Sequence, residues 1–258
     1  MVDVMSELEL QIVVGSTRPG RAADRFLPWL RDRAERHGRF SVRWLDLREW
    51  DLPFFQETTA DMLAGRFTTP TVHRWNEVVA GGDAYLYVFP EYNHSVPAVL
   101  KNAFDYALGA RLRNKPAGFV AYSGGPIAGA RAVEHMVGIT VEREMAPLRN
   151  AVLLGRVGQA FAEDSGLPVD PGTEHALAIL LDDLAWWGRA LKAARAAGEL
   201  PPPRQRPVLP PPGPIRARPG AAGPRQGPAA NGPAPEPAPE AEDVQAGGSG
   251  VSPGVNRG

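Results

Sequence analysis

Short apolar runs alternate along the chain with segments in which apolar residues recur at helical spacing. Most of the runs are rich in β-branched and aromatic residues, which is typical of strands buried on both faces. The runs lie at residues 10–14, 42–47, 84–89, 117–122 and 152–154. Because strands and helices alternate, the pattern predicts five parallel strands in one open sheet, with helices on both faces.

The segments between the strands carry helix signals of different kinds. Helices are predicted over residues 22–37, 70–80, 96–108, 130–144 and 173–197. Thr69 followed by Pro70 is a typical helix start, because threonine caps the first turn and proline fits its first position. Pro28 lies inside the first helical pattern, where proline removes a backbone hydrogen bond. That helix is therefore expected either to kink or to begin near Pro28.

The composition changes sharply after Leu200. Residues 201–258 include 16 prolines and 10 glycines and few large apolar side chains. Such a segment cannot bury enough apolar surface to offset its conformational entropy, so we expect a disordered tail. The run from Arg206 to Pro212 is typical of a polyproline II docking peptide for a partner, with a solvated low-complexity tail as the simpler interpretation. The sequence thus predicts one folded domain within residues 1–200.

Composition and charge exclude several classes of function. The chain has 28 basic and 29 acidic residues and a formal net charge of −1, which argues against nucleic-acid binding through basic charge. It has no cysteine, so disulfides, thiolate nucleophiles and cysteine-ligated metals are excluded. No apolar run approaches the roughly 20 residues that span a bilayer, so no membrane association is expected and a cytoplasmic location is the default. No histidine set has metal-ligand spacing, and no metal site is predicted.

The loop at residues 15–21 follows the first predicted strand and has the character of an anion site. Ser16 and Thr17 supply hydroxyl groups, Arg18 and Arg21 supply guanidinium groups, and a helix begins directly afterwards. Together with backbone N–H groups these can hold a phosphate. The loop lacks the Lys-Ser/Thr pair of a nucleotide P-loop and the glycine spacing of the dinucleotide motif. The alternative is a plain strand-to-helix turn with surface arginines.

A second loop follows the third predicted strand and suits a flat ligand. Pro90 fixes the strand exit, Tyr92 and His94 present flat faces, and Asn93 offers both a donor and an acceptor. Ser95 is expected to cap the next helix. The alternative is a capped turn in which Asn93 and Ser95 bond only their own backbone.

A third loop, residues 123–129, follows the fourth predicted strand. Its glycines, including Gly124 and Gly125 directly after Ser123, let the backbone approach a ligand and direct N–H groups at it. By itself this loop is equally consistent with a merely flexible turn. In open parallel sheets, however, ligands bind beyond the carboxyl ends of the strands. The three loops together therefore predict a mononucleotide cofactor across the end of a flavodoxin-like sheet.

Three motifs resemble those of the NADPH-dependent FMN reductase family. They are Gly-Ser-Thr-Arg-Pro-Gly-Arg at 15–21, Pro-Glu-Tyr-Asn-His-Ser-Val-Pro at 90–97 with Leu-Lys-Asn-Ala-Phe-Asp at 100–105, and Arg-Ala-Val-Glu-His at 131–135. The resemblance covers about residues 10–160. It implies a flavodoxin-like fold, FMN, NADPH or NADH as electron donor, and a homodimer or homotetramer. The chain departs from the family pattern at Pro28, at Ala98, where the family usually has glycine, and in its proline-rich tail.

The resemblance also implies roles for individual residues of the three loops. Ser16, Arg18 and Arg21 would bind the FMN phosphate, with Thr17 beside them. Pro90, Glu91, Tyr92 and Asn93 would line the flavin ring, and Ser123, Gly124 and Gly125 would approach its pyrimidine edge. No side chain is expected to act as nucleophile or general base, because the flavin supplies the reactivity.

The implied activity is that of an FMN-dependent NAD(P)H oxidoreductase. Hydride would pass from NAD(P)H through the bound flavin to a quinone, an azo compound, a metal oxyanion or free flavin. An alternative is a non-catalytic flavin-binding electron carrier or redox-sensing protein whose proline-rich tail recruits partners. The nearly neutral charge favours the enzyme, because carriers often present an acidic surface. A third interpretation is an α/β scaffold that binds no flavin.

Overall fold

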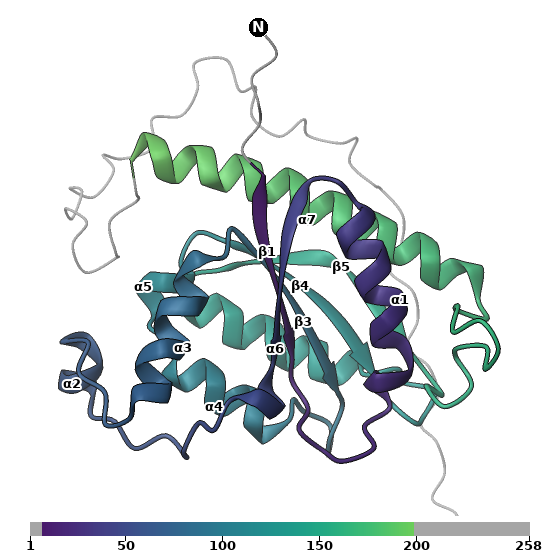
Figure 1. Cartoon of the computed structure of the whole chain (residues 1–258), viewed down its shortest axis with the longest axis horizontal. Coiled ribbons are helices and arrows are strands. Elements are labelled where there is room, and N and C mark those ends of the chain that lie inside the picture. The colour runs from purple at the N-terminus through teal and green to yellow at the C-terminus, as the bar shows by residue number, and fades with distance from the viewer. Residues whose placement is uncertain (1–6, 199–258) are drawn as a thin grey trace, which may run out of the picture. The chain divides into compact units, whose positions relative to one another are not determined.

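Five parallel strands form one sheet in the computed structural model, which describes residues 7–198 (Figure 1). The strands are β1 (Leu8–Val14), β2 (Phe40–Asp46), β3 (Ala84–Pro90), β4 (Pro116–Tyr122) and β5 (Ala146–Leu154). Their order across the sheet is β2-β1-β3-β4-β5, and every neighbouring pair is parallel. This is the strand order of a flavodoxin-like fold, so the predicted fold class is confirmed.

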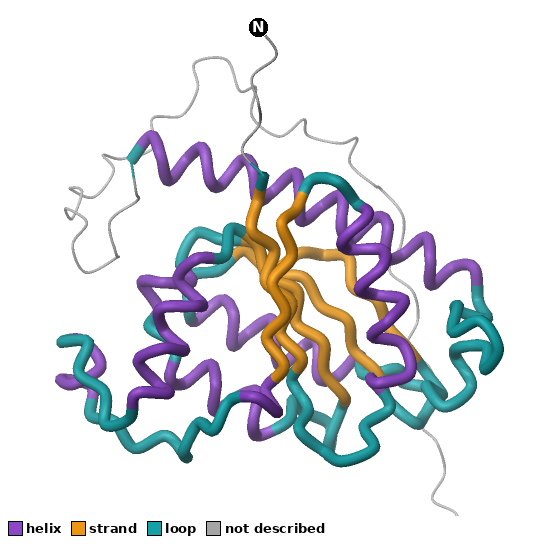
Figure 2. Tube along the Cα trace, viewed as in Figure 1, coloured by secondary structure: helices purple, strands orange, loops and turns teal. Residues whose placement is uncertain are grey.

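Helices cover both faces of the sheet (Figure 2). They are α1 (Ala23–Arg36), α2 (Thr59–Leu63), α3 (Pro70–Gly81), α4 (Ala98–Tyr106), α5 (Gly109–Leu112), α6 (Ala130–Glu142) and α7 (Pro171–Ala197), with a 3₁₀ turn η1 (Leu47–Glu49) after β2. The side chains of α1 and α7 pack on one face. Those of α3, α4 and α6 pack on the other, as parallel crossovers of one handedness require.

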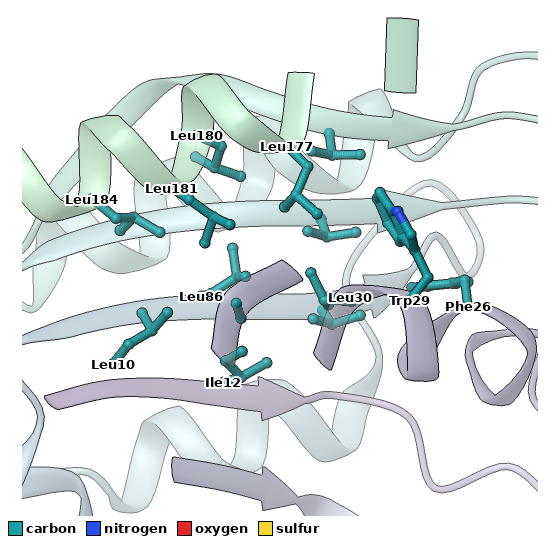
Figure 3. Close-up of a cluster of buried hydrophobic side chains, with 14 of the residues drawn as sticks. Leu10, Ile12, Phe26, Trp29, Leu30, Leu86, Leu177, Leu180, Leu181 and Leu184 are labelled. Atoms are coloured by element: carbon teal, nitrogen blue, oxygen red, sulfur yellow. The ribbon is translucent and has the colours of Figure 1, made fainter. Parts of the chain in front are cut away.

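A leucine stripe of α7 forms the core on the first face (Figure 3). Leu177, Leu180 and Leu184 are at most 1% exposed and lie over strand residues such as Leu86. Each such buried side chain contributes about 1.5–3 kcal/mol relative to exposure. The helix can approach this closely because β4 carries Gly118, where a Cβ atom would lie 2.9 Å from Leu180 Cδ1.

The last strand is longer than the pattern at residues 152–154 predicts. β5 begins at Ala146 and includes Pro147 and the exposed Arg149. Because β5 lies at the edge of the sheet, one side of it faces solvent and polar side chains or a proline are tolerated. An apolar run is therefore a poor guide to the length of an edge strand.

Two helix starts illustrate what local signals predict well and poorly. Thr69 caps α3 by accepting from the backbone N–H of Val72, as predicted. The helix after the second loop, by contrast, begins at Ala98 and not at residue 96. Ser95 does not cap it, because its hydroxyl lies 2.9 Å from His135 Nδ1 on α6.

Pro28 neither delays nor ends the first helix, since α1 runs unbroken from Ala23 to Arg36. None of the helices within residues 7–198 is both long enough and apolar enough to cross a bilayer. The predicted tail at 201–258, with its docking run, lies outside the described residues.

Candidate functional site

The three loops singled out in the sequence meet at the carboxyl edge of the sheet. They follow β1, β3 and β4, which are neighbours in the sheet, and Figure 2 shows them gathered at one end of the strands. Hydrogen bonds tie the start of each of two loops to the neighbouring strand: Gly15 N–H donates to Val88 O of β3, and Glu91 N–H donates to Tyr122 O of β4. The hydroxyls of Ser16 and Tyr92, 76 positions apart in the chain, lie 3.0 Å from each other.

The first loop presents unpaired donors. Within the described part of the chain, the backbone N–H groups of residues 16–18 have no acceptor. Thr17 and Arg18 are exposed, and the Arg18 guanidinium forms no ion pair with the described residues. Successive free N–H groups beside a free cation form a site for an anion such as phosphate.

Arg21 lies beneath this loop and is already engaged. Its side chain is only 2% exposed, and its Nε donates to Asp24 at 2.8 Å. Its two Nη atoms donate to the Asp46 carboxylate, and Nη1 also donates to Ser16 O at 2.6 Å. Burial alone would raise the pKa of Asp46, but the hydrogen bonds and charge of Arg21 outweigh it and lower that pKa. Arg21 therefore fixes the loop from below, through a bidentate ion pair to the end of β2.

Arg48, which follows β2, fixes the same loop from the side. Its Nη2 donates to Arg18 O at 2.6 Å and its Nη1 donates to Asp24 at 3.0 Å. Its backbone N–H donates to Asp46 Oδ1 at 3.1 Å. Sequence reasoning missed Asp46 and Arg48, although their place directly at the end of a predicted strand was the available signal.

The second loop is a tight turn that holds two residues in the left-handed region. Asn93 and His94 have φ values of 49° and 66°. The N–H of Tyr92 donates to Ser95 O, and the N–H of Ser95 donates to Tyr92 O, as in a two-residue hairpin. Asparagine and histidine are among the non-glycine residues that best tolerate this conformation. The turn leaves both side chains exposed at the edge of the sheet.

Glu91 joins this turn to α6. Its side chain is 4% exposed, and Oε1 accepts from Arg131 Nε at 2.7 Å. Oε2 is buried and has no partner within the described residues. A buried carboxylate oxygen in this state needs a donor, which a water molecule or a bound molecule can supply. Pro90, which precedes it, is itself buried as the last residue of β3.

The third loop leaves space at its glycines. A Cβ atom at Gly124 or Gly125 would meet nothing within 4 Å, and neither N–H has an acceptor in the described part of the chain. The loop is nevertheless held in shape: the Ser123 hydroxyl donates to Gly125 O at 3.0 Å, and the N–H of Arg156 donates to the same oxygen at 3.1 Å.

These features suit a bound phosphorylated ring better than the alternative, in which the loops are plain turns without a ligand. Plain turns would satisfy their own backbone groups, whereas unpaired N–H groups remain at 16–18 and at Gly124 and Gly125. Free donors on β1's loop suit a phosphate, and the open, glycine-lined loop after β4 suits a flat ring edge. Fold and site thus define a flavodoxin-like, mononucleotide-binding protein.

Comparison with known proteins agrees with this class. The family model described as NADPH-dependent FMN reductase matches residues 9–159, and the chain belongs to this family. An NAD(P)H-dependent FMN reductase of Schizosaccharomyces pombe is 29% identical over 150 residues, which cover 57% of this chain and 74% of the relative. A quinone reductase of Pseudomonas putida is 31% identical over 150 residues, 55% of this chain and 76% of the relative.

A solved structure resembles the chain as well. It is the flavoenzyme NAD(P)H:(acceptor) oxidoreductase FerB from Paracoccus denitrificans, with 25% sequence identity and a TM-score of 0.57. The match covers 71% of this chain and 98% of FerB. The family confirms the expectations of FMN as cofactor, NAD(P)H as electron donor and an oxidoreductase activity.

Proposed function

We propose that this protein oxidises NAD(P)H with bound FMN and reduces a small organic acceptor, a quinone in the first instance. Its membership of the FMN reductase family and its similarity to a quinone reductase support this. The observation that carries it is the set of unpaired N–H groups after β1 and after β4, the two strands on either side of β3. When bound, FMN accepts hydride from the nicotinamide and returns the electrons to the acceptor.

In this proposal the first loop holds the FMN phosphate. The N–H groups of residues 16–18, the hydroxyls of Ser16 and Thr17 and the free guanidinium of Arg18 are its donors. Arg21 contributes through the loop, because its nitrogen atoms already donate to Asp24, to Asp46 and to the backbone. It is a positioning residue for the phosphate site.

The other two loops bind the ring. The turn from Pro90 to Asn93 lines one side, with its geometry fixed by the hairpin bonds between Tyr92 and Ser95. The free N–H groups of Gly124 and Gly125, at positions where a Cβ atom would meet nothing within 4 Å, would stabilise negative charge on the ring's pyrimidine edge. Ser123 maintains this loop by its hydrogen bond to Gly125 O. Groups outside these loops must cover the ring and exclude water from it.

In this proposal, the groups that cover the flavin ring belong to a second copy of the chain. A groove of about 710 Å³ lies between α4 and α6, next to the second loop, and its lining includes Val96, Phe104 and Ile139. Its rim carries both signs of charge, with Lys101 and Arg143 as well as acidic residues, which suits a self-complementary contact. A homodimer formed through this groove would place one copy beside the flavin of the other.

An exposed phenylalanine near α4 supports the same contact. Phe54 is 86% exposed, while the backbone around it is fixed by Tyr106 Oη, which donates to Phe54 O at 3.0 Å. Asn102 of α4 also donates to Pro53 O and accepts from the N–H of Phe55. A rigidly held apolar side chain at the surface is typical of an interface anchor.

Two variants of α6 test the dimer. Ile139→Asp is expected to convert dimers to monomers in light scattering, whereas Val141→Asp, on the same helix but outside the groove, leaves them intact.

An anaerobic titration tests the activity. The purified full chain is mixed with NADPH or NADH, and a quinone is then added while flavin absorbance is followed. Loss of the oxidised flavin band on adding nucleotide, and its return on adding quinone, is expected. Flavin that stays oxidised with both nucleotides contradicts the enzyme and favours the electron carrier. Protein that neither contains nor takes up FMN contradicts both.

The proposed activity also fits a cytoplasmic location, because NADPH and NADH are available in the cytoplasm.

A further inference from the structure

The five tyrosines of the chain differ in what their hydroxyl groups contact. Four have a partner: Tyr85 Oη donates to Val79 O, Tyr106 Oη donates to Phe54 O at 3.0 Å, Tyr92 Oη lies 3.0 Å from Ser16 Oγ, and Tyr87 Oη lies 3.8 Å from Met145 Sδ. The hydroxyl of Tyr122 is buried and has no hydrogen-bond partner among the described residues. The residue is 4% exposed. A buried hydroxyl is rarely left unpaired, so this one calls for a partner that is not part of the folded chain.

Tyr122 is the last residue of β4, and its side chain lies on the α1 face of the sheet. Its ring packs edge-to-face against Phe26 of α1, with the ring centroids 5.4 Å apart. The polar groups that act on its hydroxyl are those of Ser16 and Tyr92 and the charges of Arg21 and Asp24. The hydroxyl thus points across the end of β3 toward the loop that follows β1.

The neighbouring polar groups have partners of their own. Ser16 Oγ lies 3.0 Å from Tyr92 Oη and is the group whose hydrogen bonding opposes the effect of burial on the pKa of Tyr122, while the Arg21 guanidinium is bound to Asp24 and Asp46. Burial raises the pKa of Tyr122, so the hydroxyl keeps its proton and remains a donor throughout the physiological range. On the buried side of the first loop it is the one hydroxyl donor, within the described residues, that still lacks an acceptor.

We propose that the Tyr122 hydroxyl donates a hydrogen bond to the phosphate of FMN, alongside the backbone N–H groups of residues 16–18. The inference rests on the proposed function, because it assigns a further ligand-binding residue to the same site. A phosphate offers three terminal oxygens, each of which accepts more than one hydrogen bond, so it can take this donor in addition to those of the loop. Because Tyr122 is buried and Arg18 is exposed, Tyr122 would approach the phosphate oxygens from the protein interior.

The test compares FMN with riboflavin, which lacks the phosphate. The full chain, freed of flavin, and its Tyr122→Phe variant are titrated with each compound, and quenching of flavin fluorescence gives the affinity. We expect Tyr122→Phe to weaken FMN binding about 10-fold, as loss of a hydrogen bond to a charged group does, and to leave riboflavin binding unchanged. Tyr87→Phe, a buried tyrosine on the other face, is the matched control and is expected to change neither affinity.

A second measurement separates ligand binding from a structural role. Because Tyr122→Phe keeps the ring against Phe26 and removes an unpaired hydroxyl, the flavin-free variant should resist urea as well as the natural chain or better. A lower urea midpoint overturns the inference, since it would show that the hydroxyl stabilises the fold. Equal FMN affinity in variant and natural chain overturns it too, as does an equal loss for FMN and riboflavin. A natural chain that binds neither compound contradicts the proposed function itself.

Discussion

Polar groups at the two ends of the strands differ in whether they have partners. At the amino edge, where the parallel strands begin, Asp83 accepts from Lys192 at 2.7 Å, from Arg195 at 3.1 Å and from the backbone N–H of Glu9 at 3.2 Å. Lys115 there donates to Ala80 O at 2.7 Å. These charged groups all have partners in the chain, and the contacts of Asp83 fasten the end of α7 to the strands.

At the carboxyl edge, donors and acceptors remain unpaired. The N–H groups of residues 16–18, Glu91 Oε2 and the Tyr122 hydroxyl have no partner among the described residues. The groups below them are paired, as the Arg21–Asp46 ion pair shows. The contrast separates polar groups that hold the fold together from polar groups that have no partner in the described part of the chain, within one sheet.

The largest expected effect comes from the ion pair under the first loop. Asp46→Ala leaves the buried guanidinium of Arg21 with the Asp24 carboxylate and the Ser16 carbonyl as its partners among the described residues, so the free energy of unfolding should fall by about 3 kcal/mol. FMN affinity should fall as well, because the loop loses its support. Urea denaturation and flavin titration measure the two effects. Asp61→Ala, which removes an exposed ion pair to Arg66, should change stability far less and is the control.

The amino edge offers the contrasting change. Asp83→Ala removes the partner of Lys192 and Arg195, and about 2 kcal/mol of stability should be lost, less than for a fully buried pair because Lys192 is partly exposed. Flavin affinity, measured well below the unfolding transition, should not change. Weaker FMN binding in this variant would mean that the two edges do not act separately.

Arg18 tests the carboxyl edge in the opposite sense. Arg18→Ala should weaken FMN binding about 10-fold, or about 1.4 kcal/mol, because a charged hydrogen bond to the phosphate is lost. The thermal unfolding midpoint of the flavin-free chain should stay the same, since Arg18 forms no ion pair with the described residues. Arg36→Ala, an exposed arginine on α1, serves as control and should affect neither. Unchanged affinity would remove Arg18 from the site.

The smallest expected effect is on pH dependence. The pKa of Asp46 is lowered in the folded chain, so between that value and the unfolded value of about 3.9 the unfolded chain binds more protons. The stabilising contribution of Asp46 is therefore complete above about pH 4 and is lost as pH falls through its folded pKa. The stability difference between the natural chain and Asp46→Asn, measured in urea, should shrink as pH falls from 5 to 3. A difference that stays constant would contradict the assigned ionisation.

Much of the fold could be predicted because its signals are local. Buried strands appear as apolar runs, and Thr69-Pro70 marks the start of α3 by the chemistry of the cap alone. The edge strand β5 and the start of α4 were predicted less well. In both places the neighbouring elements decide: solvent on one side of β5, and His135 as the partner of Ser95.

The candidate site could likewise be predicted only in part. Glycines, hydroxyls and arginines in loops after strands indicate an anion-binding edge, and the motifs resemble one family, which the comparison confirmed. Sequence alone did not reveal that Arg21 is engaged by Asp46, because residues 25 positions apart come together only when β2 pairs with β1. It also gave no reason to examine Tyr122, because this tyrosine ends an apolar run that predicts a buried strand.

The order of strands and helices, the flavodoxin-like class and the three loops were determined by the sequence itself, because hydrophobic period and turn chemistry act over a few residues. Which donors are left over was decided only by the tertiary structure. A hydrogen bond forms between whatever groups the packing brings together, so the free groups at the carboxyl edge are known only after all the others have been paired.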